Sequence, residues 1–571
     1  MELTLVAVAG IVSIVVVAAL SRRIGVAAPL SQVVVGTALS FLPGVPHIVI
    51  EPDLVLAGVL PPLLYAAAVR MPAHDFRRDF KAIAGLAVVL VVLTTLGAGL
   101  LFNSLLPGLG LAYAFALGAI ISPTDAVAAT SVGRRLGLPS RLLTILEGEG
   151  LVNDASSLVL LSSAIAATTA TVSLWTIGGD FLYAVVAATV VGILIGQLNV
   201  RVRAWLKDSV LNTAISFVLP FVAYVPAEAI HASGVLAVVV TGVITGHQSP
   251  RYLRAADRVT EAINWSTVSF LLESGLFLLM GLQLKAVLDD AHASGPSIAT
   301  AVGIGLLASV LAIGARMVYV APLVAGQRRD AGRAEAAQPR IDAVQAKLDE
   351  MIQNDELSEQ QKKRFTVRFT QRKSDLRFAV AEKFGWRGGV VLAWSGMRGA
   401  VTVAAAQTLP ASTPYRPQLQ LIAFVVAITT LLLQGLTLPW VIRKARVPGD
   451  DRAADREEFG DLLTQLSVAA LAHVDDPELR MPDGTEYSPE ILDRAREELA
   501  VRQTRPATAA TASRTGLREQ YVQLRTEILQ AERRELLTAR TLGTYSSRVL
   551  TRAQDALDTE EARVSRFVEE S

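Results

Sequence analysis

The chain has 571 residues, of which 52% are hydrophobic and only 18% are charged. This composition excludes an ordinary soluble protein and predicts an all-α polytopic membrane protein. The net charge of +1 is uninformative by itself, and no nucleic-acid partner is expected. Because the sequence contains no cysteine, disulfides, thiolate metal ligands and a cysteine nucleophile are excluded.

Apolar runs long enough to cross ~30 Å of hydrocarbon recur from the N-terminus to about residue 442. The first run lacks a basic segment before it and is followed by Arg22 and Arg23, so it is interpreted as a retained span rather than a signal peptide. Thirteen spans are predicted, near residues 3–20, 24–42, 52–69, 82–103, 109–130, 142–170, 175–199, 209–226, 232–247, 260–285, 297–325, 388–410 and 417–442.

The connections between these spans differ in their basic residues. The first, third, fifth, seventh and ninth carry arginine or lysine, whereas the even-numbered ones carry almost none, with Lys285 and Arg416 as exceptions. By the positive-inside rule, this alternation predicts an outside N-terminus and a cytoplasmic C-terminus in the plasma membrane. The predicted domains are a transmembrane region at 1–445 with a cytoplasmic helical insertion at 327–387, and a cytoplasmic helical region at 446–571.

The stretch LLTILEGEGLVNDASS at 142–157 places three carboxylates in an otherwise apolar span. A charge near the bilayer centre costs at least ~2.5–3.5 kcal/mol even on the lenient insertion scale. Glu147 and Asp154 lie about two helical turns apart, and Glu149, Asn153 and Asp154 also share a helix face. The alternatives are a re-entrant turn whose carboxylates face water and a polar site in a helical bundle. The pattern favours the polar site, with Asp154 as the titrating group.

The span at 109–130 contains a helix breaker at depth. Pro123 removes a backbone donor and clashes with the preceding turn, so the helix is predicted to break beside it. The freed carbonyls and the hydroxyls of Ser122 and Thr124 are natural oxygen ligands for a hard cation in a protein-lined cavity. A simple proline kink is the alternative, and Asp125 next to the kink favours the functional interpretation.

A second break is predicted in the span at 388–410, where Gly396 and Gly399 bracket Arg398. The two broken spans are seven apart in order and therefore oppositely oriented, which is typical of inverted repeats in secondary transporters with a midplane site. Asp125 and Arg398 would neutralise the half-helix dipole ends where the breaks meet.

Two further charges lie within later spans. Glu273 is a lone carboxylate with apolar flanks, and Arg316 is either its partner or a residue that reaches the cytoplasmic interface. Glu273, Glu147, Ser122 and Ser157 are therefore expected to be accessory site residues.

Several stretches together resemble the monovalent cation:proton antiporters of the sodium/proton exchanger family, bacterial type. They are LPPLLYAAAV at 60–69, SPTDAVAA at 122–129, LEGEGLVNDASS at 146–157, LLESGLFLLMGLQL at 271–284 and SGMRGAVTVA at 395–404. The similarity extends over about residues 1–445. It implies two crossed broken helices, a mobile core domain, and a homodimer in membrane lipid.

The resemblance also implies roles for single residues. Asn153 and Asp154 would bind an alkali cation, with Asp154 alternating between that cation and a proton. Thr124 and Asp125 would lie on the broken helix beside the cation. A structural ion pair would join Glu149 to Arg398.

Two positions depart from the family pattern. Gly150 stands where many members have a serine hydroxyl, and Ala66, Ala67 and Ala68 stand where many have a carboxylate. Water, Ser156 or Ser157 could fill these places, so cation preference is not carried over from the family.

Desolvation favours the neutral form of a carboxylic acid, whereas a bound cation favours the ionised form, so proton and cation compete for one aspartate. We therefore expect antiport of Na⁺, or of K⁺ or Li⁺, against H⁺, without enzymatic activity or cofactor, serving pH and cation homeostasis. A single titrating acid beside an uncharged Asn153 predicts one-for-one, electroneutral exchange. The alternatives are an intramembrane aspartyl protease using Asp125 and Asp154, which leaves Arg398 unexplained, and a cation channel.

The charged regions are predicted to be helical. The insertion is expected to hold two helices, with a capping box at Ser358 and Gln361 opening the second, and its basic stretch 362–377 is a candidate contact for anionic lipid. In the C-terminal region, a helix is predicted to begin at Pro489. A linker is predicted at 505–514. A helical stretch is predicted at 515–568, broken near Gly543.

Overall fold

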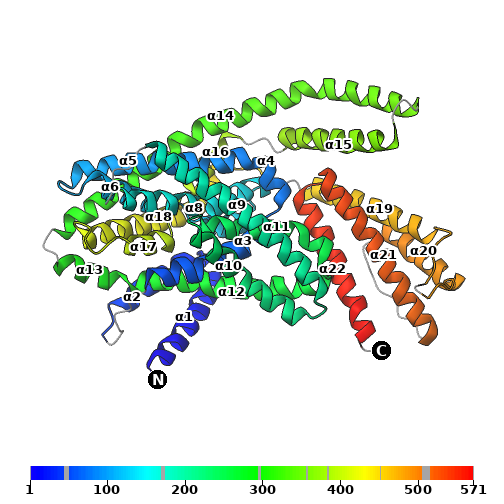
Figure 1. The fold of residues 1–571 in the computed structure, drawn as a ribbon, viewed down its shortest axis with the longest axis horizontal. Coiled ribbons are helices and arrows are strands. Elements are labelled where there is room, and N and C mark those ends of the chain that lie inside the picture. Colours follow the sequence, from blue (N-terminus) through cyan, green and yellow to red (C-terminus); the bar gives the residue numbers. More distant parts are fainter. Residues whose placement is uncertain are drawn as a thin grey trace. The chain divides into compact units, whose positions relative to one another are not determined.

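The computed structural model describes residues 2–43, 51–168, 174–293, 297–354, 358–381, 385–449, 452–481, 483–504 and 515–569. Over these residues the fold is all-helical, as predicted, and none of them lies in a strand (Figure 1). The chain divides into two compact units. One comprises Met1–Gln248, Ala262–Arg328 and Phe384–Gly449, and the other comprises Ser249–Glu261, Arg329–Lys383 and Asp450–Ser571.

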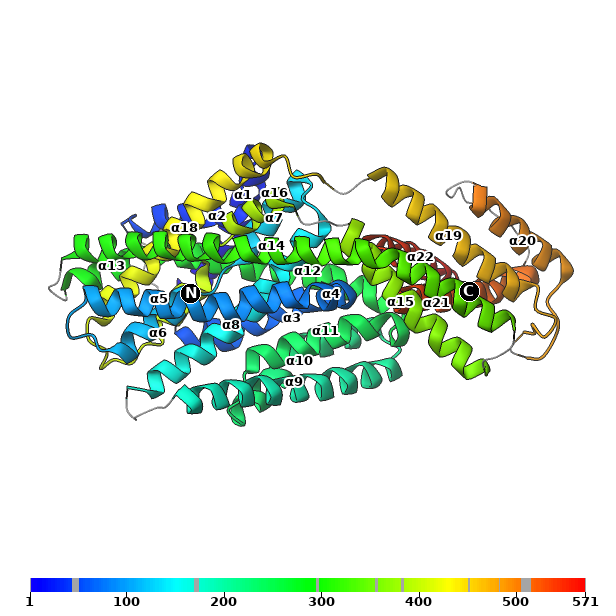
Figure 2. The ribbon, with the colours of Figure 1, turned by 90° about the horizontal axis from the view of Figure 1, so that it is seen from above.

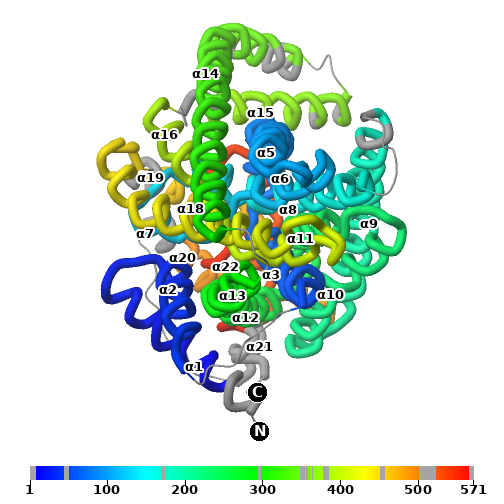
Figure 3. Tube along the Cα trace, turned by 90° about the vertical axis from the view of Figure 1, so that its left-hand side faces the viewer, coloured from blue at the N-terminus to red at the C-terminus, as the bar shows by residue number. Residues whose placement is uncertain are grey.

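The first unit is a bundle of apolar helices. Its elements are α1 (Glu2–Ile24), α2 (Ala28–Ser40), η1 (Leu54–Val59), α3 (Leu60–Arg70), α4 (Ala73–Ala84), η2 (Gly85–Val89), α5 (Leu90–Leu105), α6 (Leu111–Ile121), α7 (Ala126–Leu136), α8 (Ser140–Ala166), α9 (Leu174–Trp205), α10 (Ser209–Ala229), most of α11 (Gly234–Tyr252), most of α12 (Ala255–Leu282), α13 (Leu284–Ala293), the first part of α14 (Ile298–Gln353), α16 (Trp386–Trp394), α17 (Ala400–Gln407) and α18 (Arg416–Ala445). Helices α9 and α10 lie side by side in Figures 2 and 3.

Each of the thirteen predicted spans coincides with one helix or with one interrupted helix. Among the described residues, seven helical segments are long and apolar enough to cross a membrane, namely Ala73–Leu105, Leu111–Leu136, Gly178–Trp205, Ser209–Ala229, Ala255–Ala293, Ile298–Lys347 and Arg416–Ala445. The total of thirteen membrane crossings stays a prediction.

Both predicted helix breaks are present. Helix α6 ends at Ile121 and α7 begins at Ala126, while α16 ends at Trp394 and α17 begins at Ala400. Pro123 cannot continue the first helix, because it lacks the amide hydrogen that the next turn requires. The two breaks meet directly, because the Asp125 amide donates to the Met397 carbonyl across 2.7 Å.

Close helix crossings depend on glycine. Gly36 on α2 and Gly281 on α12 face each other so closely that a Cβ on either one would overlap the backbone of the other helix. Gly118 on α6 lies equally close to Thr95, where an added Cβ would be 2.5 Å from the carbonyl oxygen. Small residues permit such contacts between membrane helices, where packing rather than the hydrophobic effect drives association.

The predicted insertion differs from expectation in one respect. Its first helix is a continuation of α14, which runs unbroken to Gln353, because the residues after Arg328 are mainly strong helix formers. The second helix, α15 (Glu359–Ala381), begins at the predicted capping box: Gln361 N donates to Ser358 Oγ, and Ser358 N donates back to Gln361 Oε1 across 3.0 Å.

The C-terminal part of the second unit contains α19 (Arg452–Val474), α20 (Pro489–Thr504), α21 (Thr515–Leu542) and α22 (Ser547–Glu569). Helix α20 begins at Pro489 as predicted, and α21 ends at Leu542, directly before Gly543, whose φ of 64° leaves the helical region. Leu462, Leu536 and Leu550 form part of a core of this unit. The predicted linker at 505–514 lies outside the described residues.

Candidate functional site

The acidic stretch 142–157 is helical throughout in α8, so the re-entrant-turn alternative is wrong. Three of its polar residues point into the bundle: Glu149, Asn153 and Asp154 are 2%, 1% and 9% exposed. Their shared burial follows from the four- and five-residue spacing, which places them on one helix face. The helix therefore carries a polar face into the interior of the first unit.

Hydrogen bonds join this face to the break between α6 and α7. Thr124 Oγ1 donates to Glu149 Oε1 across 2.7 Å, and the Asn153 amide donates to Thr124 O and Oγ1 across 2.9 and 3.0 Å. Both donations use the nitrogen of the Asn153 side chain. Its oxygen, Oδ1, is buried and has no hydrogen-bond partner. A buried acceptor without a donor is uncommon, and it is free to bind a cation.

Asp154 lies on the same face. Within the described part of the chain, no hydrogen bond or ion pair engages its carboxylate, although that carboxylate interacts electrostatically with Asp125. Asp125 caps α7, because its Oδ1 accepts the Val127 amide across 2.8 Å. Gly399 lies directly against Asp125, where any Cβ would overlap Oδ2. The break of the second interrupted helix therefore needs glycine here.

The predicted ion pair between Glu149 and Arg398 is wrong. Both guanidinium nitrogens of Arg316 bond to Glu149 instead, with Nη2 and Oε2 2.7 Å apart, and Arg316 Nε donates to the Leu392 carbonyl. Arg316 is consequently not the partner of Glu273 either, and it does not reach the interface, because it is almost fully buried.

Arg398 is satisfied by backbone carbonyls. Its Nε donates to Ile121 O across 3.1 Å, its Nη1 donates to Gly396 O, and its amide donates to Thr430 Oγ1. Ile121 is the last residue of α6, whose terminal carbonyls lack intrahelical partners. A cation at a helix C-terminus is also stabilised by the helix dipole. The structure thus explains why this arginine needs no carboxylate.

The remaining predicted site residues lie around this centre. Glu147 pairs with Arg134 at the more exposed end of α8. Glu273 is partly buried and interacts electrostatically with Asp125 and with Arg70. Ser122 and Ser157 donate to carbonyls of their own helices, at 2.9 Å in both cases.

Ser156 also donates to its own helix, at Val152 O across 3.2 Å. At Gly150, an added Cβ would be 3.0 Å from Ala126 Cβ, so α8 approaches α7 closely at this position. Ala66 is buried on α3.

One buried ion pair was missed by the sequence analysis. Arg141 at the start of α8 binds Asp79 on α4 through Nη2 and Nε, at 2.7 and 2.9 Å. The sequence does contain a signal, because Asp79 is an acid among the basic residues of the third connection. The pair fixes the beginning of the helix that carries Asn153 and Asp154.

An all-helical membrane bundle whose two interrupted helices meet at buried carboxylates defines a secondary transporter with a midplane site. The family model described as sodium/hydrogen exchanger, transmembrane, matches residues 11–444. The chain therefore belongs to the sodium/hydrogen exchanger family, and it is a multi-pass membrane protein and a transporter rather than an enzyme. Cations and protons are the transported species, and no cofactor is required.

Individual relatives agree with this assignment. An uncharacterized Na⁺/H⁺ exchanger of Mycobacterium tuberculosis is 27% identical over 569 residues, covering 98% of this chain and 95% of that protein. A sodium, potassium, lithium and rubidium/H⁺ antiporter of Bacillus pumilus is 28% identical over 436 residues, covering 73% and 58%. The solved structure of the sodium proton antiporter MjNhaP1 from Methanocaldococcus jannaschii matches with a TM-score of 0.55 at 18% identity, covering 78% of this chain and 99% of that one. This last likeness shows a common fold.

Proposed function

We propose that this protein exchanges one monovalent cation for one proton, and that Asp154 is the ligand for which they compete. The observation that carries the proposal is the pair of free acceptors, the Asp154 carboxylate and Asn153 Oδ1, beside the break at Thr124. Oxygen ligands of this kind suit hard alkali cations. Protonation of Asp154 removes the negative charge that the cation needs, so the two ligands exclude each other.

The formal charges around the site support electroneutral exchange. Glu149 and Asp125 provide two negative charges, and Arg316 and Arg398 provide two positive ones. The nearby Glu273 and Glu147 are matched by Arg70 and Arg134. Asp154 is then the acid whose charge is not balanced, and it is neutralised equally by one proton or by one monovalent cation. Because both loaded states carry the same net charge, the membrane potential should not drive the exchange.

In this conformation, the exposed fractions of nearby side chains support access to the site from one face of the membrane. The side chain of Arg134 is 66% exposed and that of Glu147 is 27% exposed, whereas Asp154 is 9% exposed as a residue. Exposure therefore decreases from the junction of α7 and α8 toward the site. We assign this face to the cytoplasm, because the junction carries Arg134, Arg135 and Arg141.

Asp154→Asn tests the assignment. We expect the purified variant in liposomes with an internal pH dye to lose cation-dependent proton flux, because its side chain can neither release a proton nor supply charge to a cation. Asp180→Asn, which changes an exposed carboxylate on α9, is the matched control and should transport normally.

Challenge with Na⁺, K⁺ and Li⁺ in turn identifies the transported cation, and these three are chosen because the Bacillus pumilus relative is named as an antiporter for all of them. Normal flux in Asp154→Asn would exclude Asp154 as the shared ligand. A rate that follows a clamped potential would exclude electroneutral exchange.

The proposal includes a plasma-membrane homodimer with an outside N-terminus and a cytoplasmic C-terminus, and a division into a transmembrane region at 1–445 and a C-terminal region at 446–571. In our proposal, the exchange activity maintains cytoplasmic pH and cation levels. Light scattering of the detergent-solubilised protein measures the mass, and a monomeric mass would contradict the dimer.

We further propose that the basic stretch 362–377 on α15 contacts anionic lipid. Arg364, Arg368 and Arg372 are all exposed and follow one another at four-residue intervals, so they share one helix face. Each basic residue near an anionic surface contributes about 1 kcal/mol. Changing all three to glutamine should reduce co-flotation of the protein, held in nanodiscs, with anionic vesicles, and equal flotation would contradict the contact.

A further inference from the structure

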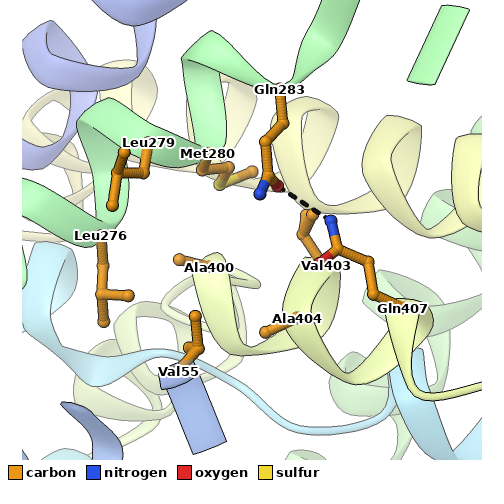
Figure 4. Close-up of a pocket in the computed structure, with 9 residues that line it drawn as sticks. All are labelled: Val55, Leu276, Leu279, Met280, Gln283, Ala400, Val403, Ala404 and Gln407. Carbon is orange, nitrogen blue, oxygen red and sulfur yellow. Dashed lines mark hydrogen bonds between the residues drawn. The ribbon is translucent and has the colours of Figure 1, made fainter. Parts of the chain in front are cut away.

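A small cavity lies between α12, α17 and η1 in the first unit (Figure 4). Its volume is about 20 Å³, which leaves room for a single water molecule. Val55, Leu276 and Met280 line it with apolar side chains, so it cannot hold a hydrated ion in this conformation. The proposed function uses none of these residues.

The two ends of the cavity differ in chemistry. At one end is Ala400, which directly follows Gly399, the residue that packs against Asp125. At the other end two carboxamides meet, because Gln407 Nε2 donates to Gln283 Oε1 across 3.1 Å (Figure 4). Gln407 is the last residue of α17, and Gln283 directly follows the end of α12. The residues that line the cavity thus extend from the break of the second interrupted helix to the ends of two helices.

These helix ends lie away from the exposed face described for α7 and α8. Helix α12 begins in the connection 249–261, and α16 and α17 follow the segment 329–383, both of which belong to the second unit. Gln283 and Gln407 are therefore at the far ends of their spans. Under the proposed orientation this is the outer face of the membrane.

Each glutamine is fixed by its own anchor. The main-chain oxygen of Gln407 accepts Arg416 Nη2 across 2.9 Å, and Arg416 Nε donates to Leu409 O, so the end of α17 is attached to the start of α18. Next to Gln283, Gly281 packs closely on α2. The hydrogen bond between the glutamines therefore bridges two helix ends that are held by different neighbours.

We propose that this cavity is the closed outer half of the ion path and that the Gln283–Gln407 hydrogen bond is the latch that keeps it closed. This inference rests on the proposed function. Carboxamides remain neutral at all physiological pH values, so the latch does not itself titrate with the protons being exchanged. When the bond breaks, the Gln283 carboxamide oxygen is released and can replace part of the hydration shell of an entering alkali cation.

Cysteine accessibility tests the latch, because the sequence contains no cysteine of its own. Ala404 lines the cavity, so Ala404→Cys is the reporter, and a membrane-impermeant methanethiosulfonate reagent is added to the outer face of oriented vesicles. We expect Gln283→Ala or Gln407→Ala to raise its labelling rate by roughly tenfold, the scale set by one lost hydrogen bond. Ala406→Cys, on the same helix but not at the cavity, is the matched control and should not respond.

Either single variant breaks the same bond, so the double variant should label no faster than each single one, and additive increases would contradict a shared latch. A reporter that is labelled equally fast with and without the glutamines, or only from the inner face, would overturn the proposal. Labelling requires no transport, so the same measurement in an Asp154→Asn background separates failure of the latch from failure of the proposed exchange.

Discussion

Glu149 lies near two arginines that are held in different ways. Arg316 binds its carboxylate, whereas Arg398 binds carbonyls that the helix breaks leave free. The sequence places all three charges within predicted spans, but it leaves Arg316 either paired with Glu273 or at the cytoplasmic interface. It does not reveal which arginine reaches Glu149, because that depends on where α14 packs against α8. Pairing by resemblance therefore selected the wrong arginine.

Arg316→Leu should destabilise the protein strongly. Removing one partner leaves Glu149 buried without its counter-charge, which typically costs about 3–5 kcal/mol. We expect a lower midpoint of thermal unfolding in detergent, as measured by tryptophan fluorescence. Replacing both residues, Glu149→Met with Arg316→Met, should recover much of that loss, because no unpaired charge remains. A single variant as stable as the native chain would contradict the structural role of this pair.

At the scale of elements, the two interrupted helices could be predicted, because Pro123 and the Gly396–Gly399 bracket are local signals. Their contact could be expected only in outline from the inverted order of the spans. The cavity beside α17 could not be predicted, because Gln283 and Gln407 lie in segments without any shared pattern. Contacts between distant helices are set by packing, and packing leaves little trace in local sequence.

Gly399→Ala tests the contact between the breaks. The added Cβ would overlap Asp125 Oδ2 and lie 2.8 Å from its Cγ, so Asp125 must move and its cap on α7 must weaken. We expect the transport rate in liposomes to fall at least about tenfold, since small displacements at a site are costly. Gly314→Ala on α14, where an added Cβ meets nothing within 4 Å, should be neutral. Equal rates in both variants would contradict the proposed importance of this contact.

At the scale of the molecule, the second unit combines three separate stretches of the chain. The helices of the C-terminal region could be predicted from their caps and composition, but the association of 249–261 with them could not. Arg258 from this connection binds Asp558 on α22 through two nitrogens, and Arg533 on α21 binds the same carboxylate. The junction of α11 and α12 thus belongs to a cytoplasmic module in our proposed topology.

Asp558→Ala should release the connection 249–261 from α22. Both arginines are largely buried, so removing their shared carboxylate should destabilise this contact by about 3–5 kcal/mol. We expect faster tryptic cleavage at Arg251 or Arg254 in the folded protein. Asp475→Ala removes an exposed ion pair with Arg496, worth less than about 1 kcal/mol, and should leave the cleavage rate unchanged. Unchanged cleavage in Asp558→Ala would show that other contacts hold the loop.

The breaks of the two interrupted helices are fastened to each other at two points, from Asp125 N to Met397 O and from Arg398 to Ile121 O. Under the proposed function, we expect the two breaks to move as one rigid body together with the bound cation. Because its lipid-facing helices would move against acyl chains, we expect the rate of exchange to depend on the bilayer. Thicker or stiffer bilayers should therefore slow the exchange, although lipid is not part of the proposed cation site.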